Sequence, residues 1–128
     1  MELELLKGRF SVCRVPDLSG ADLAGELCFT AKTDCEFSLV CREECVPETA
    51  IQSEPGWSCF RIAGRLDFGL VGVLAGITHV LAEAQISVFA VSTYLTDYVL
   101  IREVECKRAA GALEAAGYRL SDSWKETT

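Results

Sequence analysis

A polar turn in the second half of the chain combines residue types that suit the binding of a small zwitterion. Asp67 is followed by Phe68, Gly69 and Leu70, and an apolar helical pattern begins there. Free amides at a helix start suit a ligand carboxylate, the Asp67 carboxylate suits an ammonium group, and Gly69 lets a ligand approach the backbone. Two interpretations follow: these four residues bind a ligand, or Asp67 caps the helix and Gly69 serves packing.

Two hydroxyl side chains end an apolar strand pattern farther along the chain. Ser92 and Thr93 stand where a hydroxyl or backbone group can complete a pocket from a neighbouring element. We predict that both contact the same ligand as the Asp67 turn. In the alternative, Ser92, Thr93 and Asp97 satisfy the amides of a tight turn, and for Asp97 we favour this role.

The residues that carry most enzyme chemistry are sparse. His79 is the only histidine, and it lies on the small-residue side of a predicted helix, so we expect it at the surface or in an interface. Cys41 and Cys45 have no matching second pair, which argues against zinc. A pair of Cys and His in space stays open, but no motif of a cysteine nucleophile supports it. We expect no catalytic residue, no metal and no cofactor.

Composition excludes several classes of partner. Half of the 128 residues are hydrophobic and 24% are charged, as in an ordinary folded protein. The formal net charge is -7, and no segment gathers the basic residues into a patch. Nucleic acids and anionic membrane surfaces need such a patch, so we expect no nucleic acid and no membrane as partner.

The N-terminal residues and the cysteines indicate a compartment. Charged residues interrupt the first nine positions, and no apolar run reaches about 18 residues, the length that a membrane helix needs. The chain has seven cysteines, an odd number. We therefore predict a cytoplasmic protein with reduced thiols.

The second half of the chain has the clearest pattern of elements. We predict strands at 86–92 and 98–102, joined by a short polar turn into an antiparallel hairpin. Apolar spacings of three, four and seven residues predict one helix from about 70 to 84 and another over 105–116. With strands at 57–63 and 118–121, the order is βαββαβ. This order predicts an α+β ferredoxin-like sandwich with four strands.

The first half looks like a partial copy of the second. We predict strands at 10–15, 27–32 and 37–41, with a short helix around 19–25. Residues 46–56 contain two prolines and no second helical pattern, so we expect a connector with one edge strand. The predicted division is a partial module over 1–54 and a complete one over 55–128.

The predicted sheet of the second half has two apolar faces. Ile86, Val88 and Ala90 alternate with Phe89 and Val91. The helices cover one face, so the first half or a second copy of the chain must cover the other. We therefore expect a homodimer.

Several stretches resemble the ACT-domain family, in its small bacterial tandem branch related to the CASTOR arginine sensors. The resemblance rests on residues 64–75 and 86–102, most specifically on Ser-Thr-Tyr-Leu-Thr-Asp-Tyr at 92–98, and it extends to 8–14 and 36–41. It implies a ferredoxin-like regulatory module that binds amino acids near its first strand-to-helix turn and second strand. One departure is Gln85, where the family often ends the first helix with glycine.

Two hypotheses of function follow. The first is an allosteric ligand sensor that binds an amino acid or related metabolite without catalysis and regulates a protein partner that the chain does not identify. The second is a structural protein-interaction module whose pocket is vestigial. Stabilisation of the folded state by a small molecule separates the two.

Overall fold

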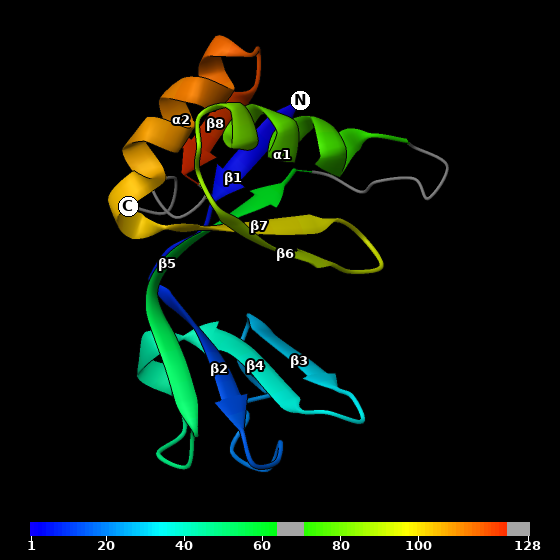
Figure 1. Ribbon diagram of the computed structural model, residues 1–128, viewed down its shortest axis with the longest axis vertical. Helices are drawn as coiled ribbons and strands as arrows, with labels where there is room; N and C mark the ends of the chain where they lie inside the picture. The colour runs from blue at the N-terminus through cyan, green and yellow to red at the C-terminus, as the bar shows by residue number, and fades with distance from the viewer. Residues whose placement is uncertain (64–70, 123–128) are drawn as a thin grey trace. The chain divides into compact units, whose positions relative to one another are not determined.

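The computed structural model describes residues 1–63 and 71–122 and has the predicted mixture of helices and strands (Figure 1). The strands are β1 (Glu2–Leu5), β2 (Phe10–Val15), β3 (Cys28–Lys32), β4 (Phe37–Arg42), β5 (Gln52–Ile62), β6 (Val88–Ser92), β7 (Asp97–Arg102) and β8 (Arg119–Asp122). The α-helices are α1 (Val73–Glu83) and α2 (Cys106–Ala115). The α+β class is therefore confirmed.

The chain divides into two compact units, which are described separately. The N-terminal unit is Gly8–Trp57, and the C-terminal unit joins Met1–Lys7 to Ser58–Thr128. This division assigns residues 1–7 to the C-terminal unit, unlike the predicted boundaries of 1–54 and 55–128. The long strand β5 begins in the first unit and ends in the second.

The sheet of the C-terminal unit contains a strand that the sequence analysis missed. The order is β6-β7-β5-β1-β8, with β1 between β5 and β8. Leu3 stands opposite Ile62 in an antiparallel ladder and opposite Leu120 in a parallel one. The Leu3 side chain is only 1% exposed. Strand β1 therefore connects β8, at the edge of the sheet, to the central strand β5.

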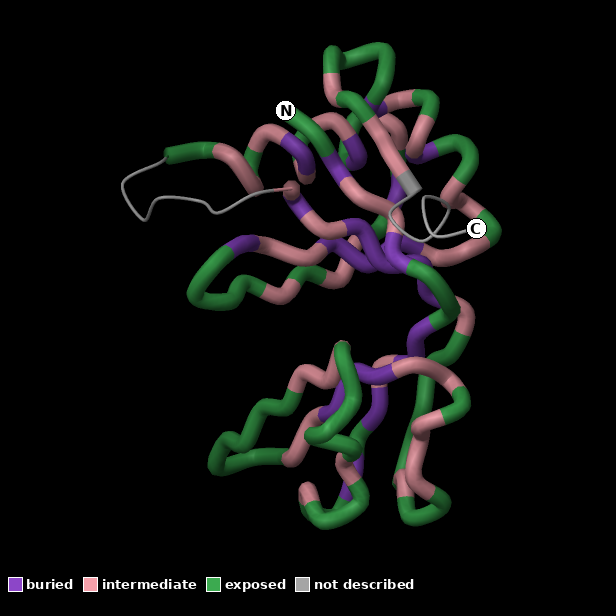
Figure 2. Tube along the Cα trace, turned by 180° about the vertical axis from the view of Figure 1, so that it is seen from behind, coloured by how far each residue is buried: buried purple, intermediate pink, exposed green. Residues whose placement is uncertain are grey.

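Two helices cover one face of this sheet (Figure 1). Buried and exposed positions alternate along both helices in Figure 2, as expected for amphipathic helices. The helices and strands share a single core: Leu3, Phe60, Ile62, Ile77, Leu81, Ile86, Val99, Ile101, Ala109 and Leu113. This arrangement confirms the ferredoxin-like sandwich, with β1 as an additional strand.

Both helices end in the same hydrogen-bonded turn. At the end of α1, Gln85 N donates to Ala82 O and Ile86 N to Leu81 O, both at 2.9 Å. This pair of hydrogen bonds is a Schellman motif, in which the residue after the C-cap has a left-handed backbone conformation. Gln85, which stands where the family often has glycine, has φ 59 and therefore lies in the left-handed region. Gly117 holds the equivalent position after α2, with φ 99.

The N-terminal unit has strands in the order β3-β4-β2-β5 and a small core of Cys13, Val15, Leu39 and Cys41. The predicted helix at 19–25 is wrong, because residues 16–27 form turns. Asp17 Oδ1 accepts a hydrogen bond from Ser19 N at 2.9 Å, which stabilises a turn instead of a helix. The edge strand predicted within residues 46–56 exists and is the first half of β5, which begins at Gln52.

The two hairpins repeat with a constant shift of 60 residues, since β3 begins at Cys28 and β6 at Val88, while β4 ends at Arg42 and β7 at Arg102. Thr33 and Thr93 hold the same place in the two turns, and each donates its amide to the carbonyl three residues on, Glu36 at 3.0 Å and Thr96 at 2.9 Å. A short 3₁₀ helix follows each hairpin, at Glu43–Cys45 and Glu103–Glu105. The hairpins thus have the same local structure.

Candidate functional site

The end of the β6–β7 hairpin carries the described part of the predicted site. Ser92 is the last residue of β6 and stands opposite Asp97, and Thr93 follows it. Both residues are exposed. The amide and the hydroxyl of Thr93 each donate to Thr96 O at 2.9 Å. Thr93 therefore stabilises the turn with both its amide and its hydroxyl.

Thr96 fastens this hairpin to the central strand of its own unit. The Thr96 side chain is buried, and its Oγ1 donates to Ile62 O at 2.8 Å. Ile62 is the last residue of β5, directly before the chain enters residues 64–70. Ser92 and Thr93 thus belong to a hairpin that Thr96 fastens to the strand end leading to the predicted turn. The sequence analysis missed Thr96, although Thr93 and Thr96 both lie in the family-like phrase at 92–98.

The four other predicted ligand residues, Asp67, Phe68, Gly69 and Leu70, lie outside the described residues. The chain is described again from Val71, and α1 begins after Gly72, which has φ 82 and no side chain that caps the helix. The N-cap of α1 is therefore Gly72 and not Asp67. On the β5 side, Ala63 N donates to Glu2 O at 2.9 Å, so β1 helps to fix the strand end.

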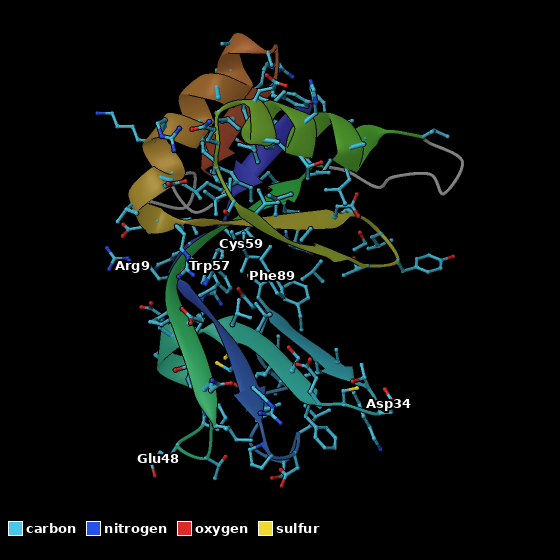
Figure 3. All side chains as sticks on the ribbon, in the orientation of Figure 1. Arg9, Asp34, Glu48, Trp57, Cys59 and Phe89 are labelled. Carbon is cyan, nitrogen blue, oxygen red and sulfur yellow. The ribbon has the colours of Figure 1, made fainter. Side chains whose placement is uncertain are left out.

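The face of the sheet opposite the helices is partly apolar and partly charged. Figure 3 shows Phe89 on this face, away from the helices. Arg61 and Glu4 form an ion pair on neighbouring strands, with 3.4 Å between Nη2 and Oε2. Burial lowers the pKa of Arg61, but its bonds to Glu4 and Tyr98 outweigh this and raise it overall, so the guanidinium stays charged. The predicted second apolar face is therefore interrupted by a charged pair.

The candidate catalytic and metal-binding residues do not assemble into a site. His79 is exposed, and its Nε2 lies 3.9 Å from Glu83 Oε1 on the same helix, which confirms the predicted surface position. Within residues 1–63 and 71–122, no group of three or more His, Cys, Asp or Glu side chains is arranged to hold a metal ion. In the same part of the chain, no helix is long and apolar enough to cross a bilayer.

Four thiols of the N-terminal unit belong to its core or pack against it, whereas Cys35 is exposed. Cys13 and Cys41 are buried, and Cys28 and Cys45 pack against them. Burial, followed by the neighbouring thiols, raises the pKa of Cys41 to about 12. Burial also raises the pKa of Cys28. Because the thiolate is the reactive form, Cys41 is a poor nucleophile at neutral pH.

Comparisons with known proteins identify a family and several structures that this chain resembles. The family model described as "ACT domain" matches residues 52–115. Protein Atu0741 from Agobacterium tumefaciens is 30% identical, with 93% of this chain and 90% of that chain covered and a TM-score of 0.83. A comparison with curated proteins gives no match.

Two more distant structures share the fold. A protein of unknown function from Vibrio cholerae, VC0802, described as a possible transport protein, is 23% identical, with 87% and 85% coverage and a TM-score of 0.72. The ligand-free regulatory subunit of aspartate kinase from Thermus thermophilus is 12% identical, with 90% and 94% coverage and a TM-score of 0.56. At these identities the likeness is one of fold.

Proposed function

The chain belongs to the ACT-domain family, and on this premise we propose that it is a cytoplasmic, homodimeric amino-acid sensor that regulates a protein partner without catalysis. The family and its regulatory neighbours support a ligand-binding regulatory role. To this role the proposal adds that the ligand is an amino acid, that the protein catalyses no reaction, and which residues bind the ligand.

The observation that carries the proposal is the bond from Thr96 Oγ1 to Ile62 O. It fastens the hairpin that carries the exposed Ser92 to the end of β5, from which the chain continues to Asp67. A hydroxyl, a carboxylate and the backbone of a strand-to-helix turn are the groups that recognise an α-amino acid, because its ammonium needs an acceptor and its carboxylate needs donors. We place the ligand between Asp67, Phe68, Gly69 and Leu70 on one side and Ser92 and Thr93 on the other.

The proposed organisation is a tandem pair of modules. The shift of 60 residues between the two hairpins supports the proposal that the N-terminal unit, predicted as 1–54 and observed as Gly8–Trp57, is a partial copy of the ACT module that the C-terminal unit, predicted as 55–128, forms. The resemblance to the branch of the CASTOR arginine sensors makes arginine the first ligand to test. Asp67 suits either the α-ammonium group or a basic side chain of such a ligand.

The second candidate function is a protein-interaction module with a vestigial pocket. The observation that favours it is the exposed hairpin tip, where Tyr94 is 67% and Leu95 53% exposed. Thr93 also uses its hydroxyl within its own turn. In this alternative the hairpin tip contacts a protein and no small molecule stabilises the fold.

A thermal-unfolding screen of the twenty amino acids and related metabolites tests the proposal. A ligand at about 100 times its Kd adds about 2.7 kcal/mol to the free energy of unfolding. The hit is then measured by calorimetry on Asp67→Asn, which we expect to keep nearly the native melting temperature and to bind roughly tenfold more weakly. Asp97→Asn is the matched control, with unchanged affinity. Flat melting curves at millimolar concentrations of every compound would reject the sensor and favour the interaction module.

A further inference from the structure

A groove of about 510 Å³ runs under α2 in the C-terminal unit. Its lining residues come from three strands, from α2 and from the turn before it: Leu5, Ser58, Phe60, Glu103, Cys106, Lys107, Ala110, Glu114 and Leu120. We propose that this groove is a second ligand site, which binds a small carboxylic acid with an apolar body. Its volume lies in the range of small-molecule pockets.

The strand register explains the apolar floor. Leu5 stands opposite Phe60, and Leu3, two residues before Leu5, stands opposite Leu120. Leu5, Phe60 and Leu120 all pack against the core beneath the helices, so they lie on the helix-facing side of neighbouring strands. Above them α2 presents Ala110, whose side chain is too short to fill the space. An aliphatic chain in the groove would therefore remove apolar surface from water.

Two lining residues of the groove, Ser58 and Lys107, have side chains that donate hydrogen bonds. Ser58 is 7% exposed, and its hydroxyl has no hydrogen-bond partner among the described residues. Because Ser58 lines the groove, its hydroxyl can donate a hydrogen bond to a ligand oxygen there. Lys107 lies in the first turn of α2, and its ammonium has no ion-pair partner in residues 1–63 and 71–122. Both groups can donate to a carboxylate, and the positive end of the helix dipole adds to their effect.

The lining also contains two acidic residues, Glu103 and Glu114. Glu103 already takes part in an interaction within the chain. Glu114 lies seven residues after Lys107, which is about 10 Å along a helix, and it borders the end of the groove near Leu120. A carboxylate beside Lys107 and Ser58 therefore has its apolar body over Leu5 and Phe60.

The groove is distinct from the amino-acid site proposed above. In the sheet order β6-β7-β5-β1-β8, the hairpin end belongs to β6 and β7, whereas the floor of the groove belongs to β5, β1 and β8. The two sites thus share no lining residue. Binding at one can be measured while the other is mutated.

Titration with sodium hexanoate at neutral pH, followed by calorimetry and amide chemical shifts, tests the proposal. Hexanoate is a suitable probe because it has one carboxylate, an aliphatic chain and no ammonium group. We expect shifts at Ser58, Lys107 and Ala110 and none at Ser92. Lys107→Met removes the charge and keeps the apolar stem, and we expect roughly tenfold weaker binding, since hydrogen bonds to charged groups contribute about 1.5–3 kcal/mol.

The control variants separate position from net charge. Lys7→Met changes the net charge equally in the same unit outside the groove, and we expect unchanged affinity. Glu114→Gln should leave the affinity for hexanoate unchanged or increase it. Ala110→Trp fills the groove and should abolish binding, with circular dichroism to show that each variant is folded.

Three outcomes would overturn the proposal. The first is tighter binding of hexylamine than of hexanoate, which would make the groove a cation site. The second is an equal loss of affinity for hexanoate in Lys107→Met and Lys7→Met, which would show that the net charge of the protein, and not the position of Lys107, determines binding. The third is no binding of hexanoate together with a dimer that Ala110→Trp dissociates, which would make the groove an interface between copies of the chain.

Discussion

At the scale of single residues, the buried hydroxyl of Thr96 links the proposed site to the stability of the unit. Thr96→Val keeps the shape and leaves Ile62 O without its donor, so we expect the free energy of unfolding to fall by about 1–3 kcal/mol. Thr96→Ser retains the hydroxyl and should lose less. Urea unfolding measures both, with Thr30→Val on the exposed face of β3 as the matched control. Equal losses in Thr96→Val and Thr30→Val would contradict the structural role of the bond.

The raised pKa of Cys41 predicts how stability depends on pH. In the unfolded chain this thiol ionises near its ordinary pKa of 9.0, whereas in the folded chain it keeps its proton up to about 12. Between these values the folded state binds more protons than the unfolded state. The contribution of Cys41 is therefore fully present below about pH 9 and is lost as the pH rises toward 12.

Urea unfolding under reducing conditions at several pH values from about 8 to 10 measures this effect. We expect the decline with pH to be shallower in Cys41→Ala by up to about 1.4 kcal/mol per pH unit, the value for one proton. Cys35→Ala removes an exposed thiol and should keep the native slope. If the free energy of unfolding declines with pH at the same slope in both variants, the ionisation of Cys41 does not cause the loss of stability at alkaline pH.

At the scale of elements, the two helix ends offer a matched pair of substitutions. Gln85 and Gly117 occupy the same position of the same motif, but only Gly117 has the residue type that adopts a left-handed backbone without strain. We expect Gln85→Gly to raise the free energy of unfolding by up to about 1 kcal/mol and Gly117→Ala to lower it by about 1 kcal/mol. Chemical unfolding of both variants measures the pair. A loss of stability in Gln85→Gly would show that its side chain contributes more than its backbone strain costs.

Elements with a strong periodic pattern were predictable from the sequence. The hairpin and the second helix of the C-terminal unit begin and end close to the predicted positions, because apolar periodicity and Gly117 define them. The helix predicted at 19–25 failed because Asp17 and Ser19 form a turn, a local competition that periodicity does not detect. Strand β1 was missed because its four residues include two glutamates and its partners lie far away in sequence.

The candidate site was predictable in part. Ser92 and Thr93 were singled out because hydroxyl residues at a strand end are a local signal; their place at the end of β6 is confirmed, and their contact with a ligand stays a prediction. The role of Thr96 depends on Ile62, 34 residues earlier in the chain, so no local pattern identifies it. The groove under α2 depends on three strands that meet only in the folded unit, and Ser58 had no motif that singled it out.

At the scale of the whole molecule, residues 1–7 belong to the C-terminal unit, so a substitution among them should destabilise that unit. Leu3 is 1% exposed in the core of that unit, so we expect Leu3→Ala to lower its free energy of unfolding by about 2–5 kcal/mol. Leu23 is 71% exposed, and Leu23→Ala should change stability little. Hydrogen exchange measures where protection is lost. Loss confined to Gly8–Trp57 in Leu3→Ala would contradict the assignment of residues 1–7.

The position of β1 between β5 and β8 also determines the order of events on the ribosome. Gly8–Trp57 is continuous in sequence, so its strands can pair while translation proceeds. Residues 1–7 are synthesised before this unit, whereas their parallel neighbour β8 is synthesised after it. Strand β1 must therefore stay unpaired with β8 while all the residues between them are made. A nascent chain that stalls before β8 would have a folded first unit and an open sheet edge in the second.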